Sequence, residues 1–250
     1  MGHDRNVMRI ISTANFLGKV LLMNGAETYR VEQSISKVCQ RFGLKSESFV
    51  TTTCVLTSAR KKNGEIITEL NRVYNLSNNL NRIDRIHSIV LNIDKYDLDT
   101  LEKEIKKIQS ESIYRSYIIL ISYFCSAAFF ALLFKGKLID AIVAGFGGCF
   151  IFYMMRFANR IKVNNFFINT LGGFVVTIFT TFVKKINIVS NASYSTIAIL
   201  MLLVPGLALT NAIRDLINGD FIAGNSRMVE AFLIGAALAI GTGFALAIAY

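Results

Sequence analysis

The positions of apolar and charged residues divide the chain into two regions. Residues 1–115 are rich in Lys, Arg, Asn, Asp and Glu, whereas residues 116–250 consist mostly of long uncharged blocks joined by short charged links. A helix needs about 20 apolar residues to cross a bilayer, because its backbone polar groups must be satisfied within the helix. Five blocks meet this requirement, and we expect membrane spans near residues 117–134, 138–155, 166–183, 194–213 and 231–249.

The first region shows helical and then strand periodicity. Apolar residues from Val7 to Leu21 fall on one helical stripe, and a second helix is expected from about Ala26 to Arg41. The β-branched run 46–59 and residues 66–76 predict a β-hairpin at about 46–76, with Lys62-Asn63-Gly64-Glu65 as its turn. We therefore predict a mainly α-helical polytopic membrane protein, in which a small cytoplasmic α+β domain (1–115) precedes a membrane domain of five transmembrane helices (116–250).

The composition agrees with a membrane protein. Hydrophobic residues make up 53% of the 250 positions, and the mean hydropathy of +0.46 is too high for an ordinary soluble domain. The net charge of +10 borders the apolar blocks, which suits membrane topology better than nucleic-acid binding. The nucleotide-binding, zinc-protease and hydrolase motifs are absent from the sequence. We expect no enzyme activity, no catalytic residues, no metal and no other cofactor.

The charged first region also predicts the orientation. It carries no recognisable signal peptide, so we expect it to stay in the cytoplasm. The N-terminus would then be cytoplasmic, and five spans of a cell-membrane protein would place Tyr250 outside. Asp140 lies at the start of its block, where we expect an anchor at the membrane interface.

The fifth block has small residues at every fourth position in two registers, which allow helices to approach closely. One register holds Gly235, Ala239, Gly243 and Ala247, and the other holds Ala237, Gly241, Ala245 and Ala249. Such faces pack either inside one helical bundle or against another subunit, which would include a second copy of this chain in a homo-oligomer.

The stretch NGAETYRVE, residues 24–32, is a first candidate site. At 100° per residue, Glu27 lies within about 40° of Val31 on the apolar stripe of its helix. A carboxylate on the packed side needs a partner, and Arg30, three residues further on, is the local candidate.

The stretch LLVPGLALTNAIRDLINGD, residues 202–220, is a second candidate. Pro205 removes a backbone donor and Gly206 loosens the helix, so nearby carbonyl groups lose their partners. Broken spans of this kind form substrate or ion sites in transporters, although a simple packing kink is the alternative.

Polar residues continue this stretch beyond the break. Asn211 and Asp215 are four residues apart, as are Thr210 and Arg214, so each pair shares a helix face. Such a face would bind an anionic or zwitterionic solute, with Arg214 meeting a carboxylate and Asp215 an ammonium group or a proton. A solvated turn with a local ion pair is the alternative.

Together, these stretches resemble the threonine/serine exporter family, specifically its N-terminal, large-subunit half as it occurs in the split two-subunit form. NGAETYRVEQSISKVCQRFGL follows the family's Gly-x-Glu-Thr-x-Arg-Val-Glu run, and LLVPGLALTNAIRDLINGDFIAGNSRMVEA matches its Val-Pro-Gly, Arg-Asp, Gly-Asp, Gly and Arg positions in order. The resemblance covers nearly the whole chain. The motif positions in this sequence are Glu27, Thr28, Arg30, Glu32, Pro205, Gly206, Asn211, Arg214, Asp215, Gly219, Asp220, Gly224 and Arg227.

The resemblance implies a subunit of a secondary, ion-gradient-driven exporter of small amino or carboxylic acids, with threonine and serine or succinate as cargo types. It also implies a second, smaller multi-span subunit. Our hypothesis is that Pro205 and Gly206 shape the helix break, that Arg214 and Asp215 line the inner mouth of the path, and that Glu27 with Arg30 couples the soluble domain to it.

A membrane-anchored sensor or regulatory binding protein is the alternative function. Five spans with a helix break and polar ends are more than an anchor needs, which favours transport. A membrane-embedded enzyme would need a nucleophile or metal cluster that the sequence lacks.

Overall fold

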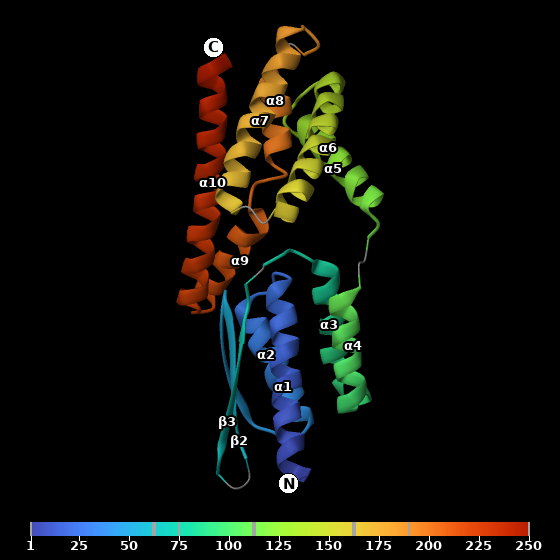
Figure 1. Cartoon of the computed structure of the whole chain (residues 1–250), viewed down its shortest axis with the longest axis vertical. Helices are drawn as coiled ribbons and strands as arrows, with labels where there is room; N and C mark the ends of the chain where they lie inside the picture. Colours follow the sequence, from blue (N-terminus) through green and yellow to red (C-terminus); the bar gives the residue numbers. More distant parts are fainter. Residues whose placement is uncertain are drawn as a thin grey trace. The chain divides into compact units, whose positions relative to one another are not determined.

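The computed structural model describes residues 2–61, 64–74, 76–111, 114–161, 164–189 and 191–249, and these are mostly helical (Figure 1). The prediction of a mainly α-helical protein is therefore confirmed. The elements follow the order α1 (Gly2–Met23), α2 (Thr28–Arg41), β1 (Ser46–Thr51), β2 (Cys54–Arg60), β3 (Ile66–Arg72), α3 (Leu80–Leu91), η1 (Ile93–Lys95), α4 (Leu98–Ser110), α5 (Ser116–Leu133), α6 (Leu138–Ile161), α7 (Asn165–Lys185), α8 (Ala192–Leu200), α9 (Gly206–Ile217) and α10 (Phe221–Ala249).

The chain forms two compact units. The first contains Met1–Glu111 and Leu207–Val229, and the second contains Ser112–Gly206 and Glu230–Tyr250. The hydropathy pattern predicts one membrane region for all residues after 115. In the structure, the segment Leu207–Val229 instead packs with the N-terminal residues, because the helix is interrupted before Pro205 and the chain turns again at Gly219.

The core of the first unit forms around α1. Leu17 and Leu21 of α1 are buried with Val31 and Ile35 of α2, as the 3.6-residue periodicity of both segments predicts. Gly18 allows the two helices to approach, because a Cβ at this position would lie 2.5 Å from the Ile35 side chain. The sheet, α3, η1 and α4 contribute further buried residues to this core.

The sheet is an antiparallel meander in the order β1-β2-β3. The prediction of a single hairpin is wrong in one respect, because the run 46–59 forms two strands that turn at Thr52 and Thr53. Strong strand formers continue through this turn without Gly, Pro or Asn, so the sequence carries no local signal for it. Lys62 and Asn63 of the predicted turn lie outside the described residues.

In the described part of the chain, four helices are long and apolar enough to cross a membrane: Ser116–Leu133, Leu138–Ala158, Asn165–Lys185 and Phe221–Ala249. The predicted count of five spans is not confirmed. The block 194–213 is divided between α8, of 9 residues, and α9, of 12 residues, with a turn at 201–204. Pro205 cannot donate the backbone hydrogen bond that would continue the helix. The predicted end at Tyr250 lies outside the described residues.

Helices of the second unit approach closely at small residues. A Cβ at Gly241 of α10 would overlap the carbonyl oxygen of Thr170 in α7, and one at Gly173 would lie 2.6 Å from the Leu238 carbonyl oxygen. The register of Ala237, Gly241 and Ala245 is therefore used inside this unit, whereas the Gly235 and Gly243 positions have open space around them.

Asp140 also packs inside the second unit. It is 3% exposed, its Oδ2 accepts a hydrogen bond from the Lys137 N–H at 2.7 Å, and its backbone carbonyl accepts one from the Ser195 hydroxyl at 3.1 Å. Its carboxylate therefore caps the start of α6 in the manner of an Asp near a helix N-terminus.

Candidate functional site

The two motif stretches meet in the first unit, where the N-terminus of α2 packs against α9 and the start of α10. The chain enters α2 through a turn at Gly25, which has a φ of +91° that favours glycine. Ala26 N–H donates to the Leu21 carbonyl at 3.2 Å and closes the C-terminus of α1. This turn leaves the Gly25 and Ala26 carbonyl oxygens available to side chains from elsewhere.

Asp215 of α9 caps α2. Its Oδ1 accepts hydrogen bonds from the Thr28 backbone N–H at 3.2 Å and from the Thr28 hydroxyl at 2.9 Å, and Asp215 itself is fully buried. Glu27 occupies the N-cap position but makes no side-chain capping bond. Asp215, which lies 187 positions further along the chain, therefore accepts the hydrogen bond that an N-cap side chain usually accepts.

The Glu27 carboxylate instead pairs with two arginines. Its Oε1 accepts a hydrogen bond from Arg214 Nη1 at 2.6 Å, and its Oε2 lies 3.4 Å from Nε of Arg30, the local partner that the sequence suggests. Burial raises the pKa of Glu27, but its own backbone N–H, the Arg214 hydrogen bond and the charges of both arginines outweigh this effect and lower the pKa below its ordinary value. Glu27 is therefore a stable carboxylate.

Side chains from α9 and α10 bind the turn before α2. Asn211 Nδ2 donates to the Gly25 carbonyl at 2.8 Å, and Arg227 Nη2 donates to the Ala26 carbonyl at 2.8 Å. Arg227 Nη1 also lies 3.3 Å from Asp215 Oδ2, and both side chains are at most 7% exposed. The sequence does not indicate these two carbonyl groups as binding partners, because every residue carries the same backbone acceptor.

Asp220 joins the cluster through the turn that ends α9. Gly219 has a φ of +90°, and the Asp220 N–H donates to the Asp215 carbonyl at 2.9 Å, so the chain folds back at this point. Asp220 Oδ2 then lies 2.8 Å from the Thr28 hydroxyl. Gly224 keeps α10 close to α9, because a Cβ there would lie 2.7 Å from the Leu216 side chain.

The Thr28 hydroxyl therefore faces two carboxyl groups. A hydroxyl has one hydrogen, so it either shares that hydrogen between Asp215 and Asp220 or donates it to one carboxylate while a protonated carboxyl donates to the hydroxyl oxygen. Burial raises the pKa of Asp215, the Arg227 charge and the Thr28 hydrogen bonds lower it, and the Asp220 charge raises it again, with a net increase. The arrangement is suited to holding a proton.

Glu32 connects α2 to the sheet. Its Oε1 accepts a hydrogen bond from the Val50 N–H at 2.9 Å. Burial raises the pKa of Glu32, the Val50 hydrogen bond lowers it and the charge of Asp220 raises it, so the pKa lies above its ordinary value. Pro205 and Gly206 belong to the second unit and are not members of this cluster. The residues that the structure describes contain no group of His, Cys, Asp and Glu side chains suited to a metal ion.

The comparison with known families covers both motif stretches. The profile of the ThrE family, described as "Putative threonine/serine exporter", matches residues 12–249. The chain belongs to the threonine/serine exporter family.

Two curated relatives of this exporter-family chain carry the same name, "Probable succinate transporter subunit YjjP". The protein from Escherichia coli (strain K12) is 25% identical over 235 residues, which cover 92% of this chain and 91% of that protein. The protein from Klebsiella aerogenes is 23% identical over 223 residues, which cover 88% of this chain and 86% of that protein. No solved structure matches the chain significantly.

Membership in the exporter family, together with the apolar helices, identifies a multi-pass protein of membrane transport. The resemblance drawn from the two motifs is thereby confirmed. Within the exporter-family chain, the first motif and the Asn211–Arg227 part of the second form one buried network of ion pairs and hydrogen bonds.

Proposed function

We propose that this chain is one subunit of a secondary exporter of small amino or carboxylic acids, with threonine, serine and succinate as the candidate cargoes, and that a second, smaller membrane subunit completes the transporter. The family match over residues 12–249 carries this proposal. The word "subunit" in the names of both relatives supports a partner. Family membership also favours transport over the sensor alternative.

The cluster at the start of α2 supports a coupling role. Helix α9 begins directly after the Pro205 break and carries Arg214 and Asp215, which bind Glu27 and Thr28 of α2. Any displacement of α9 would separate buried charges and hydrogen-bonded groups, which is costly in a low-dielectric environment. The cluster would therefore couple the position of α9 to that of α2.

The ion that drives export is, in this proposal, a proton carried by Asp215. The geometry that supports it is the single Thr28 hydroxyl between two carboxyl oxygens, at 2.9 and 2.8 Å. Protonation would leave Arg227 beside a neutral acid and weaken the ion pair that holds α10 to α9.

Efflux from loaded cells tests the function. Cells that express the chain with its smaller partner are loaded with threonine, serine or succinate, and efflux is followed with and without an uncoupler. We expect uncoupler-sensitive efflux of at least one solute, and equal efflux with and without the protein pair for all three would reject the cargo assignment.

Variants at matched membrane abundance test the site. We expect Arg214→Ala and Asp215→Asn to reduce export by about tenfold or more, because each leaves a buried partner without its charge. Asp94→Asn is the matched control, since its carboxylate is 90% exposed and, among the described residues, forms an ion pair with Arg41 alone. Unchanged export in both site variants would rule out the role assigned to this cluster.

A further inference from the structure

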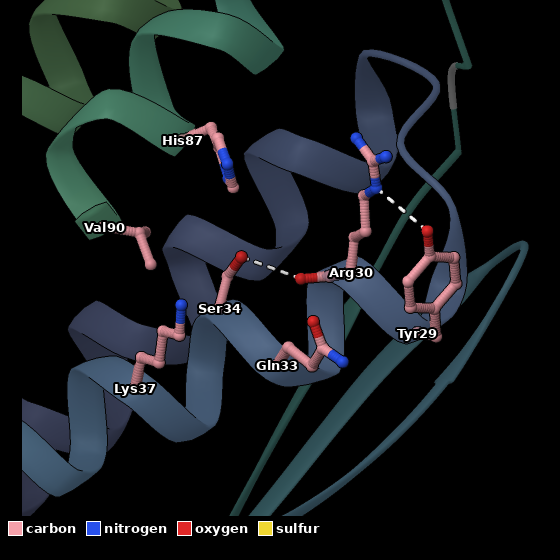
Figure 2. A pocket seen from close by; sticks show the side chains of 7 residues that line it. All are labelled: Tyr29, Arg30, Gln33, Ser34, Lys37, His87 and Val90. Atoms are coloured by element: carbon pink, nitrogen blue, oxygen red, sulfur yellow. Dashed lines mark hydrogen bonds between the residues drawn. The ribbon is translucent and has the colours of Figure 1, made fainter.

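A cavity of about 310 Å³ lies between α2 and α3 in the first unit. Figure 2 shows its lining side chains, with Arg30, Gln33 and Lys37 on α2 and His87 on α3. Arg30, Gln33 and Lys37 recur at helical spacing, so they share one face of α2. The volume is at the lower end of the range of about 300–1,000 Å³ that is typical of small-molecule sites.

The lining is basic. Arg30 and Lys37 are basic side chains, and His87 adds an imidazole from the facing helix. Among the described residues, Lys37, Gln33 and His87 have no hydrogen-bond or ion-pair partner. One carboxylate, Asp84, lines an adjoining cavity of about 180 Å³ that shares Arg30, Ser34 and His87 with the first. Basic groups therefore outnumber acidic ones along the combined cavity.

Arg30 is held by one edge of its guanidinium group. Its Nε donates to the Tyr29 hydroxyl at 3.0 Å and lies 3.4 Å from Glu27 Oε2 (Figure 2 shows the first of these contacts). Its two Nη groups donate no hydrogen bond within the described chain. A guanidinium group fixed in this way is ready to bind a carboxylate or phosphate.

We propose that this cavity binds a small anion with two acidic groups, such as a dicarboxylate. Arg30 and Lys37 are seven residues apart, which corresponds to about 10 Å along the helix axis. Their side chains can reach inward toward the two ends of one ligand, with Gln33 and His87 as donors between them. A compact anion with a single acidic group would engage one end only.

Occupancy of the cavity has a consequence for the cluster described above, because Arg30 belongs to both. An anion that pairs with the Nη groups of Arg30 shares the guanidinium charge with Glu27, whose other partner is Arg214. The proposal goes beyond the exporter function, since binding here requires neither the partner subunit nor transport. A negative binding result therefore does not bear on export, and absent export does not bear on binding.

Isothermal titration of the purified full-length chain in detergent micelles tests the proposal, with succinate, acetate, inorganic phosphate and threonine at one ionic strength. We expect saturable succinate binding, with acetate at least about tenfold weaker, which corresponds to roughly 1.4 kcal/mol. Equal binding of acetate and succinate, or tighter binding of phosphate than of succinate, would overturn the two-ended site.

Variants localise the binding. Lys37→Gln should weaken succinate binding about tenfold, while Lys37→Arg should retain it, because the charge is kept. Lys106→Gln is the matched control, since Lys106 is exposed on α4 and has no partner in the described chain. An equal loss in Lys37→Gln and Lys106→Gln would show a general charge effect and refute the site.

The nuclear magnetic resonance signal of the His87 imidazole reports ligand binding next to this side chain in the folded protein. The sequence has two histidines, so a His3→Asn chain leaves His87 as the single imidazole. Succinate should shift the imidazole resonance of this chain in a saturable way, and should shift it far less once Lys37→Gln is added. A resonance that does not respond to succinate would contradict the proposal.

Discussion

Glu27 occupies the N-cap position of α2, but the carboxylate that caps this helix belongs to Asp215. Glu27 stands at the N-cap of α2, yet its carboxylate binds Arg214 and Arg30, while Asp215 from α9 accepts the hydrogen bonds of Thr28. Both carboxylates are buried: Glu27 pairs with Arg214, which lies 187 positions away, whereas Asp215 pairs with the nearby Arg227, and its Oδ2 accepts no hydrogen bond in the described chain. Single substitutions in this network should therefore have effects that depend on which partner is left behind.

Glu27→Gln should destabilise the first unit by about 1 kcal/mol at neutral pH, since the half-exposed Arg214 limits the strength of the pair. Folding lowers the pKa of Glu27, so its contribution is present above the unfolded pKa of about 4.3 and is lost as pH falls through the lower folded pKa. Thermal unfolding should give a Tm difference between native chain and variant at pH 7 that disappears in acid. A difference that stays constant down to about pH 3 would contradict this assignment, and the exposed Glu47→Gln serves as control.

Thr28→Val should be more harmful than Thr28→Ser. Valine has a similar shape but removes the hydroxyl that faces Asp215 and Asp220, which leaves the buried Asp215 carboxylate without this donor at a cost of about 1–3 kcal/mol. Serine keeps the donor and loses one methyl group. Chemical denaturation of the two variants measures the difference, and equal stability would show that the hydroxyl contributes nothing.

At the level of single elements, α10 shows how two glycines in one helix differ. Gly241 packs against the backbone of α7, whereas Gly243 has no atom within 4 Å of the position of a Cβ. Gly241→Ala should force α7 and α10 apart and lower the Tm or the membrane abundance of the chain, while Gly243→Ala should be neutral or slightly stabilising. If both variants unfold at the native temperature, the close α7–α10 contact is not present in the protein.

The segment that contains Pro205 was the hardest element to predict. Its hydropathy favours one span over 194–213, but the proline and the following glycine divide it into α8 and α9. The hydropathy pattern does not distinguish a continuous span from two short helices, because it averages over the break. The position of the break was predictable from Pro205, whereas the separate packing of α9 was not.

At the level of the whole chain, the division into units constrains the membrane topology. Met1–Glu111 and Leu207–Val229 form one compact unit, which we propose lies on a single side of the bilayer. Helices α5, α6 and α7 would cross three times, so the chain between α7 and α9 would have to return once more through the short α8 and the turn that follows it. This count of crossings supports a broken fourth crossing, with the N-terminus and the α9–α10 turn on the same side of the bilayer.

Cysteine labelling tests this topology in a background that lacks the four native cysteines. We expect Lys185→Cys, at the end of α7, to react with a membrane-impermeant maleimide in intact cells. Asn218→Cys, an exposed position after α9, should react only after permeabilisation. Labelling of both positions from outside would exclude the proposed arrangement.

Local patterns were enough to predict the apolar blocks, the amphipathic helices α1 and α2, and the two motifs that indicated the exporter family. They were enough because hydrophobic periodicity and helix-breaking residues act within one or two turns of chain. The turn at Thr52, the packing of α9 and α10 on α2, and the capping of Thr28 by Asp215 were accessible only from the fold. Each of these depends on contacts between segments that are separated in sequence or on which backbone groups remain unpaired, and neither property is encoded by neighbouring residues.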